Sequence, residues 1–158
     1  HYGANDFWRL FVPLVAGMMA GTFLSGRLAG RLSHAHAVDL GYGLMLAAAA
    51  SSLLLAFTAV SGTFSIIVPG ALYASGMALA MPNLTLLALD IFPTHRGTAS
   101  AVQGFSQTTF NAAVAGLLAP LLSRQLPWMA AGMLVMCLTG FVLWRLARRA
   151  HRQPVALP

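Results

Sequence analysis

The chain has 158 residues, of which 58% are hydrophobic and only 8% charged, and nine basic residues against three acidic ones give a net charge of +6. A soluble globular domain carries about 25% charged residues, so this composition excludes an ordinary soluble enzyme and a disordered chain. A strongly basic soluble domain would suggest nucleic acid as a partner. Here all nine cations are arginines between long apolar stretches, which favours a membrane protein with no nucleic-acid partner.

Five apolar stretches follow one another, and a helix needs about 20 apolar residues to cross the hydrocarbon core of a bilayer. Period-2 alternation is absent, which argues against a transmembrane barrel. Pro69 and Pro82 lie in the third stretch, where we expect a tilted or kinked helix because neighbouring groups satisfy the carbonyls that prolines free. The predicted fold is an all-α integral membrane domain over residues 1–158, with five transmembrane helices at 7–27, 39–60, 64–89, 97–122 and 127–146.

The charged residues lie near the ends of these stretches. Asp39 opens the second one, where a carboxylate can cap the helix N-terminus. Arg9 and Arg124 lie on the side of the chain start, and the opposite side carries seven arginines, so the positive-inside rule predicts a cytoplasmic C-terminus. We interpret the basic tail as facing lipid headgroups; nucleic-acid binding is the weaker alternative, because the tail is short and tethered. The seven are Arg27, Arg31, Arg96, Arg145, Arg148, Arg149 and Arg152.

Small residues recur four positions apart, a spacing that lets helix backbones approach closely in lipid. Because small residues are abundant in this chain, each pair is a weak signal, but together they predict a bundle of packed helices. The pairs are Gly17 with Gly21, Gly70 with Ala74, Gly76 with Ala80, and Ala112 with Gly116.

The fourth stretch carries a polar stripe. Its members follow one another at steps of three, four and four residues, which places them within an arc of about 80° on one helix face. Amides in hydrocarbon are costly unless they meet partners or water, so the stripe either bonds neighbouring helices or lines a water-filled cavity, and we favour the cavity. Asn83 and Thr85 either share that surface or bond carbonyls freed by Pro82. The stripe is Ser100, Gln103, Gln107 and Asn111.

Signs of catalysis are absent from the sequence. No Asp, Glu, Arg or His stands in the middle of a span, and no nucleophile–base pair, phosphate-binding loop or metal-ligand spacing occurs. We therefore expect no enzyme activity, no cofactor and no metal. If transport is coupled to protons, the titrating residue is expected outside this chain, which begins with His1 and is interpreted as a fragment of a longer protein.

Two segments resemble the major facilitator superfamily of transporters. The first, from Gly21 to Arg31, is similar to the family's glycine- and arginine-rich loop signature through Gly21, Arg27, Gly30 and Arg31, although Ser25 and Gly26 stand where its acidic residue is expected. The second, residues 81–104, resembles the junction of the tenth and eleventh helices in the Bcr/CflA-like subgroup of drug:proton antiporters. It contains Asp90, Arg96, Gly97 and Gln103.

The resemblance implies that the five spans are helices eight to twelve of a twelve-helix fold whose two halves move around a midplane site. Tyr73 and Met77 would then line the cavity from the tenth helix and the polar stripe from the eleventh. The implied function is proton-coupled efflux of amphiphilic small molecules from the bacterial cytoplasm across the inner membrane, with membrane lipid and the missing N-terminal half as partners. The alternatives are a nutrient uptake porter of the same superfamily and a membrane scaffold that transports nothing.

Overall fold

The computed structural model describes residues 7–28, 30–57, 63–122 and 126–152, with side chains at Trp8 and over 11–28, 30–57, 67–120 and 127–150. These residues form helices and no β-strand, which confirms the predicted all-α class for this part of the chain. The helices are α1 (Phe7–Leu28), α2 (His34–Phe57), α3 (Thr63–Asp90), α4 (Arg96–Ala113), the π-helical segment η2 (Val114–Leu118), α5 (Ala119–Leu122) and α6 (Leu126–Arg152).

Four of the described helices, α1, α2, α3 and α6, are long and apolar enough to cross a membrane, as an integral membrane protein requires. The predicted span at 97–122 is helical from Arg96 to Leu122, through α4, η2 and α5. It is not among the four, because hydroxyl and amide side chains occupy much of α4. The composition thus supports four of the five predicted spans directly.

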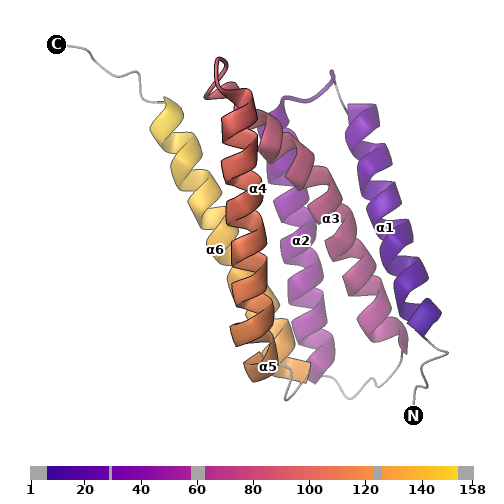
Figure 1. The fold of residues 1–158 in the computed structure, drawn as a ribbon. Coiled ribbons are helices and arrows are strands. Elements are labelled where there is room, and N and C mark those ends of the chain that lie inside the picture. Colours follow the sequence, from indigo (N-terminus) through magenta and orange to yellow (C-terminus); the bar gives the residue numbers. More distant parts are fainter. Residues whose placement is uncertain (1–6, 29, 58–62, 123–125, 153–158) are drawn as a thin grey trace.

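The four apolar helices form a layer. Figure 1 shows them side by side in the order α1, α3, α2, α6, and α4 lies in front of this layer. α3 packs against α1 and α2, and α2 also packs against α6, whereas α4 contacts α3 only lightly. No residue of α4 is buried, while Val38 of α2 and Leu79 of α3 are fully enclosed.

Glycines bring the layer's backbones together. A Cβ atom added to Gly17 would overlap the backbone of Ala71, and one added to Gly21 would overlap the backbone of Ser75. The predicted pair Gly17 and Gly21 therefore lies at the contact between α1 and α3, where small residues allow close approach.

The other small-residue pairs differ in their surroundings. Gly76 of α3 meets Gly41 of α2 backbone to backbone, and Ala74 and Ala80 are buried in the layer. By contrast, Ala112 and Gly116 are exposed, and a Cβ atom on Gly116 would have no described neighbour within 4 Å. The last pair is therefore not part of a close helix contact like those of the layer.

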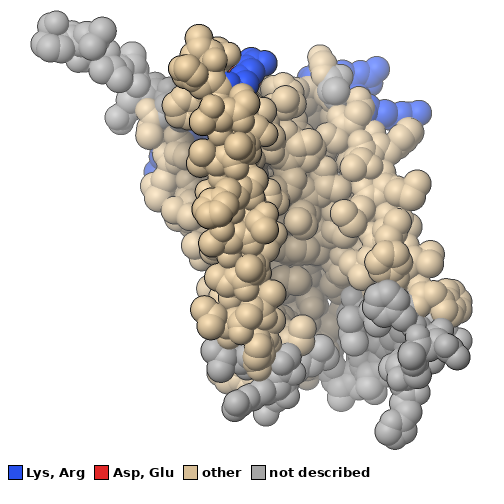
Figure 2. Space-filling model, in the orientation of Figure 1, with Lys and Arg blue, Asp and Glu red and all other residues tan. Residues whose placement is uncertain are grey.

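The arginines gather at one end of the layer. Figure 2 shows them at the end where α1, α3 and α6 finish and where α2 and α4 begin, which we call the arginine end. Six of the seven arginines expected on one side of the membrane therefore lie together at one end of the layer. They are Arg27, Arg31, Arg96, Arg145, Arg148 and Arg149; the side chains of Arg9, Arg124 and Arg152 lie outside the described set.

The start of α2 corrects the prediction for Asp39. The helix begins at His34, five residues before the predicted start at Asp39, and Ser33 caps it: the Ser33 Oγ accepts a hydrogen bond from the backbone N–H of His36 at 3.4 Å. Asp39 as a cap is wrong, because the earlier serine supplies the cap and leaves the carboxylate in the second turn, where it turns toward α6.

Candidate functional site: the polar face of α4

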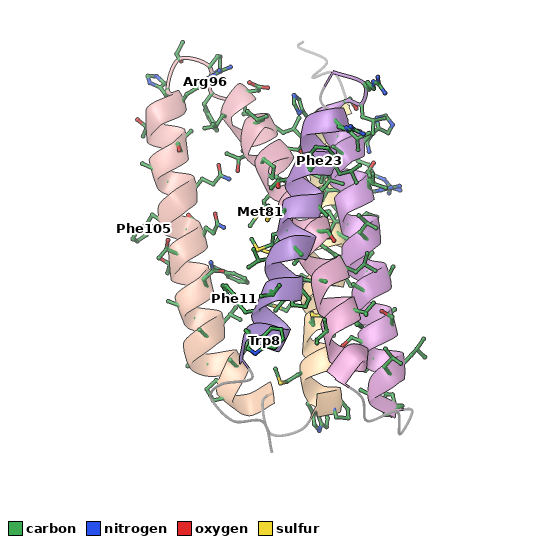
Figure 3. All side chains as sticks on the ribbon, turned by 90° about the vertical axis from the view of Figure 1, so that its right-hand side faces the viewer. Trp8, Phe11, Phe23, Met81, Arg96 and Phe105 are labelled. Carbon is green, nitrogen blue, oxygen red and sulfur yellow. The ribbon has the colours of Figure 1, made fainter. Side chains whose placement is uncertain are left out.

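The polar stripe approaches the layer through its second member. The Gln103 Nε2 donates a hydrogen bond to the Thr85 Oγ1 of α3 at 3.0 Å, and Gln103 is half-buried. Phe105, which is 74% exposed, points away from the layer in Figure 3. The helix period places the four polar residues on one face of α4. This face is therefore turned toward α3, and the Phe105 ring points outward.

The remaining members of the stripe are open to their surroundings. Ser100, Gln107 and Asn111 are all exposed, as are Ala101 and Val102 on other faces of α4. Of the two interpretations of the stripe, bonding between helices applies to Gln103. The other three amide and hydroxyl groups keep their hydrogen-bonding capacity available to water or to a ligand.

The cavity candidates Tyr73 and Met77 lie on α3. Tyr73 is half-buried, Met77 is 40% exposed, and Met77, Met81 and Thr85 recur at steps of four along one side of the helix. Figure 3 shows Met81 on the side of the layer where α4 lies. Sequence reasoning missed Met81, although its spacing from Met77 and Thr85 could have identified it.

Asn83 lies on another side of α3 and does not share the surface of Gln103. Two helical steps separate it from Thr85 by about 160° around the axis, and its side chain is buried between α1 and α2. Its Nδ2 donates to the Leu79 carbonyl at 2.8 Å and to the Ser25 Oγ at 3.3 Å. Because Pro82 lacks an N–H, the carbonyl that it frees is that of Ala78, four residues earlier, so the bond to Leu79 is not the expected bond to a freed carbonyl.

Asn83 also binds a histidine that the sequence did not single out. The His34 Nδ1 lies 2.8 Å from the Asn83 Oδ1. Because the amide nitrogen of Asn83 donates to Leu79, its oxygen accepts, and His34 must carry a proton on Nδ1. The group adjoins a cavity of about 340 Å³ that Ser25, Pro82 and Leu86 also line, and it connects three helices at the arginine end.

The residues of the two loop motifs have distinct roles in the structure. Asp90 and Arg96, which end α3 and begin α4, form an ion pair at 2.9 Å that is largely exposed. Gly30 has φ +81°, a left-handed conformation that suits glycine and turns the chain after α1. Arg31 and Gly97 are both exposed.

Arg27 and Gly21, the other two motif residues, both belong to α1. The Arg27 guanidinium lies 4.8 Å from the centre of the Phe23 ring, a distance typical of a cation–π contact. Gly21 is buried against α3. The first motif thus contributes a helix contact at its start and a turn at its end.

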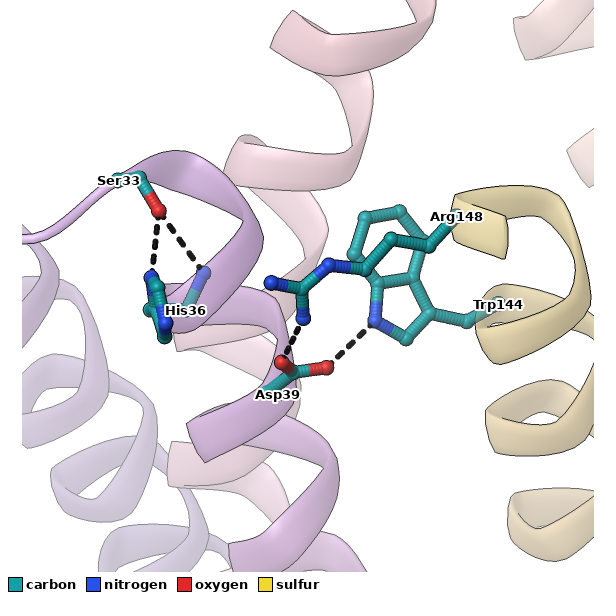
Figure 4. Close-up of polar contacts among 5 residues, drawn as sticks. All are labelled: Ser33, His36, Asp39, Trp144 and Arg148. Atoms are coloured by element: carbon teal, nitrogen blue, oxygen red, sulfur yellow. Dashed lines mark hydrogen bonds and ion pairs between the residues drawn. The ribbon is translucent and has the colours of Figure 1, made fainter. Parts of the chain in front are cut away.

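An ion pair between α2 and α6 was not predicted. The two carboxylate oxygens of Asp39 have different partners: Oδ1 accepts a hydrogen bond from the Trp144 Nε1 at 2.8 Å, and Oδ2 pairs with the Arg148 Nη1 (Figure 4). The side chains of Asp39 and Arg148 are only 25% and 19% exposed. No local sequence signal identifies this contact, because it joins positions more than 100 residues apart.

Comparisons with known proteins add no family assignment: no protein-family model matches the chain, and searches of curated proteins and of solved structures found no match. Among the described residues, no group of three or more histidine, cysteine, aspartate or glutamate side chains could hold a metal ion. The arrangement of the helices and the polar face of α4 are therefore the features that indicate a function.

Proposed function

We propose that the chain forms part of a secondary active transporter in which the polar face of α4 borders a water-filled passage. The observation that carries the proposal is the orientation of this face: Gln103 meets Thr85 of α3, while Gln107 and Asn111, on the same stripe, stay exposed. Exposed amides on a helix inside a bilayer require water or polar partners. A passage next to α4 would supply the water.

The π-helical segment η2 supports the same location. It begins directly after α4, and the backbone N–H of Ala119 bonds to the carbonyl of Val114, five residues earlier. Short π-helical segments within α-helices occur frequently at functional sites, since they widen one turn and change the direction of side chains. Here the widened turn follows Asn111 by three residues.

We further propose that the transporter is of the major facilitator type, with these helices as eight to twelve, and that it exports amphiphilic molecules in exchange for protons. Three observations support this: the motif residues Asp90 and Arg96 pair, Met81 lies on the side of the layer where α4 is found, and the six described arginines share one end. Methionine adapts to ligands of varied shape. The arginine end would face the cytoplasm of a bacterial cell.

The test replaces Gln107 and Asn111 with leucine in the full-length protein and measures flux of amphiphilic dyes into or out of vesicles with an imposed pH gradient. Loss of two hydrogen-bonding groups from the passage is expected to slow transport by about tenfold or more. Thr109→Leu is the matched control, because Thr109 is exposed and lies on the opposite side of α4. Unchanged flux in the double variant, or equal losses in both proteins, would refute the passage.

A non-transporting scaffold is the second candidate, and the bond between Gln103 and Thr85 favours it. Single cysteines at positions 103, 107 and 111, in a background without Cys137, distinguish the two functions. In a transporter, Gln107→Cys and Asn111→Cys are expected to react with a membrane-impermeant thiol reagent, whereas in a scaffold all three positions resist it. The direction of gradient-driven flux then separates export from nutrient uptake.

A further inference from the structure

A cationic pocket lies at the arginine end between the start of α2 and the end of α6. Its volume is about 280 Å³, and its lining is mostly polar. Figure 4 shows three of the lining residues, and the ion pair between Asp39 and Arg148 forms one side of the pocket. The lining consists of His36, Asp39, Arg145, Arg148 and Arg149.

The charges in this pocket do not cancel. Both carboxylate oxygens of Asp39 are engaged, by Trp144 and by Arg148, and Asp90 pairs with Arg96 elsewhere. The chain's third acidic residue precedes α1. Arg145 and Arg149 therefore have no acidic counterpart among the described residues, and the pocket keeps the positive charge of two guanidinium groups.

One of these two arginines is held in place by an aromatic ring. The guanidinium of Arg145 lies 5.6 Å from the centre of the Phe141 ring, and the Phe141 ring packs against Tyr42 of α2 at 5.7 Å between ring centres. A cation–π contact uses the face of the guanidinium and leaves its N–H groups in the plane free to donate. The pocket thus has an oriented donor next to the contact between α2 and α6.

An apolar surface continues from the pocket along α6 toward the membrane interior. Leu138 and Val142 are 43% and 52% exposed, and with Arg145 and Arg149 they fall within about 60° of one helix face. On α2, Leu40 is also exposed, at 42%. Two cations therefore stand directly above exposed aliphatic side chains, on a helix at the edge of the layer (Figure 1).

We propose that this pocket binds an anionic phospholipid, with the phosphate held by Arg145 and Arg149 and an acyl chain along Leu138 and Val142. Guanidinium groups bind phosphate oxygens through paired N–H donors, and basic pockets between helices on the cytoplasmic side suit anionic headgroups. The combination of arginines with exposed aliphatic side chains favours a lipid, because a soluble phosphate would not contact the aliphatic side chains. This site does not depend on the proposed transport function.

The experiment uses the full-length protein, extracted in detergent and mixed with phosphatidylglycerol or phosphatidylcholine, and native mass spectrometry measures the lipid retained. Wild-type protein is expected to retain phosphatidylglycerol preferentially, and the double variant Arg145→Gln, Arg149→Gln to lose about thirtyfold in affinity for it. The matched control is Arg27→Gln, Arg31→Gln, which removes two charges from the same end but not from this pocket. It is expected to stay within about twofold of wild type.

Three outcomes would overturn the proposal. Equal loss in the two double variants would mean diffuse attraction of anionic lipid to the arginine end, and no loss in either would exclude the pocket. Displacement of the lipid by inorganic phosphate at millimolar concentration would assign the pocket to a soluble anion. Circular dichroism confirms that the variants are folded, and both of them keep the ion pair between Asp39 and Arg148.

Discussion

The layer and α4 use their residues in opposite ways. Within the layer, α1, α2 and α3 meet through glycines whose missing side chains let backbones touch, and the buried residues are concentrated there. No residue of α4 is buried, and the helix presents its half-buried Gln103 to the layer. Small residues thus allow tight packing between helices of a membrane bundle. A helix that packs loosely, such as α4, can keep a polar face.

Two interhelical ion pairs among the described residues show the same contrast. Asp39 and Arg148 join α2 to α6 inside the layer, with side chains that are 25% and 19% exposed, and Trp144 adds a hydrogen bond. Asp90 and Arg96 join α3 to α4 with side chains that are 57% and 60% exposed. Solvent screens an exposed pair, whereas removing one partner of a mostly buried pair leaves a charge without its counterion, so only a substitution in the first pair is expected to cost much stability.

The largest effect is expected from a bulky residue at a glycine contact. Gly21→Leu would drive a side chain into the backbone of Ser75 and is expected to lower the free energy of unfolding by about 3 kcal/mol. Chemical denaturation in detergent micelles measures it. The control is Gly104→Leu in α4, where a Cβ atom meets nothing within 4 Å, and a change of less than about 1 kcal/mol is expected. Similar losses at both positions would contradict the contrast.

The next effect concerns the ion pair in the layer. Asp39→Ala leaves the Arg148 guanidinium and the Trp144 N–H without their common acceptor, and a loss of about 2 kcal/mol is expected. Asp90→Ala is the matched variant at the exposed pair, with an expected loss of less than about 1 kcal/mol. The same denaturation experiment compares the two, and a larger loss for Asp90→Ala would reverse our ranking of the pairs.

The smallest effect is expected at Asn83 and Asn111. Asn83→Ala removes the partner of His34 and Ser25 and is expected to cost about 1.5 kcal/mol, because buried polar groups lose a hydrogen bond. Asn111→Ala, at an exposed position of α4, is expected to change stability by less than about 0.5 kcal/mol. Thermal unfolding in detergent would show the difference, and equal melting temperatures would argue against the three-helix role of Asn83.

The contrast between the regions was only partly visible before the structure. The pair Gly17 and Gly21 could be predicted as a helix contact, because four-residue spacing alone places both on one face. The same spacing at Ala112 and Gly116 produced an equal expectation, yet both residues are exposed, and a Cβ atom on Gly116 would meet no described atom within 4 Å. A spacing rule identifies surfaces that can pack, and the position of the neighbouring helix decides which of them do.

The candidate site also contains one part that the sequence was sufficient to predict and another that it was not. The stripe from Ser100 to Asn111 follows from the helix period, so the sequence was sufficient to find it. One of the two interpretations placed Asn83 on the surface of Gln103, but Asn83 lies between α1 and α2, where His34 and Ser25 are its partners. The helix period shows that Asn83 and Thr85 lie on different faces of α3, but it does not show which neighbouring helix each face contacts.

Residue type and local period by themselves determined that the chain is helical, largely apolar and cationic at one end, since these properties depend on neighbours within a few positions. The tertiary structure alone decided that Asp39 pairs with Arg148, 109 positions away, and that His34 meets Asn83, 49 positions away. Such contacts require helices to lie side by side in a particular order, and the packing of whole helix surfaces sets that order.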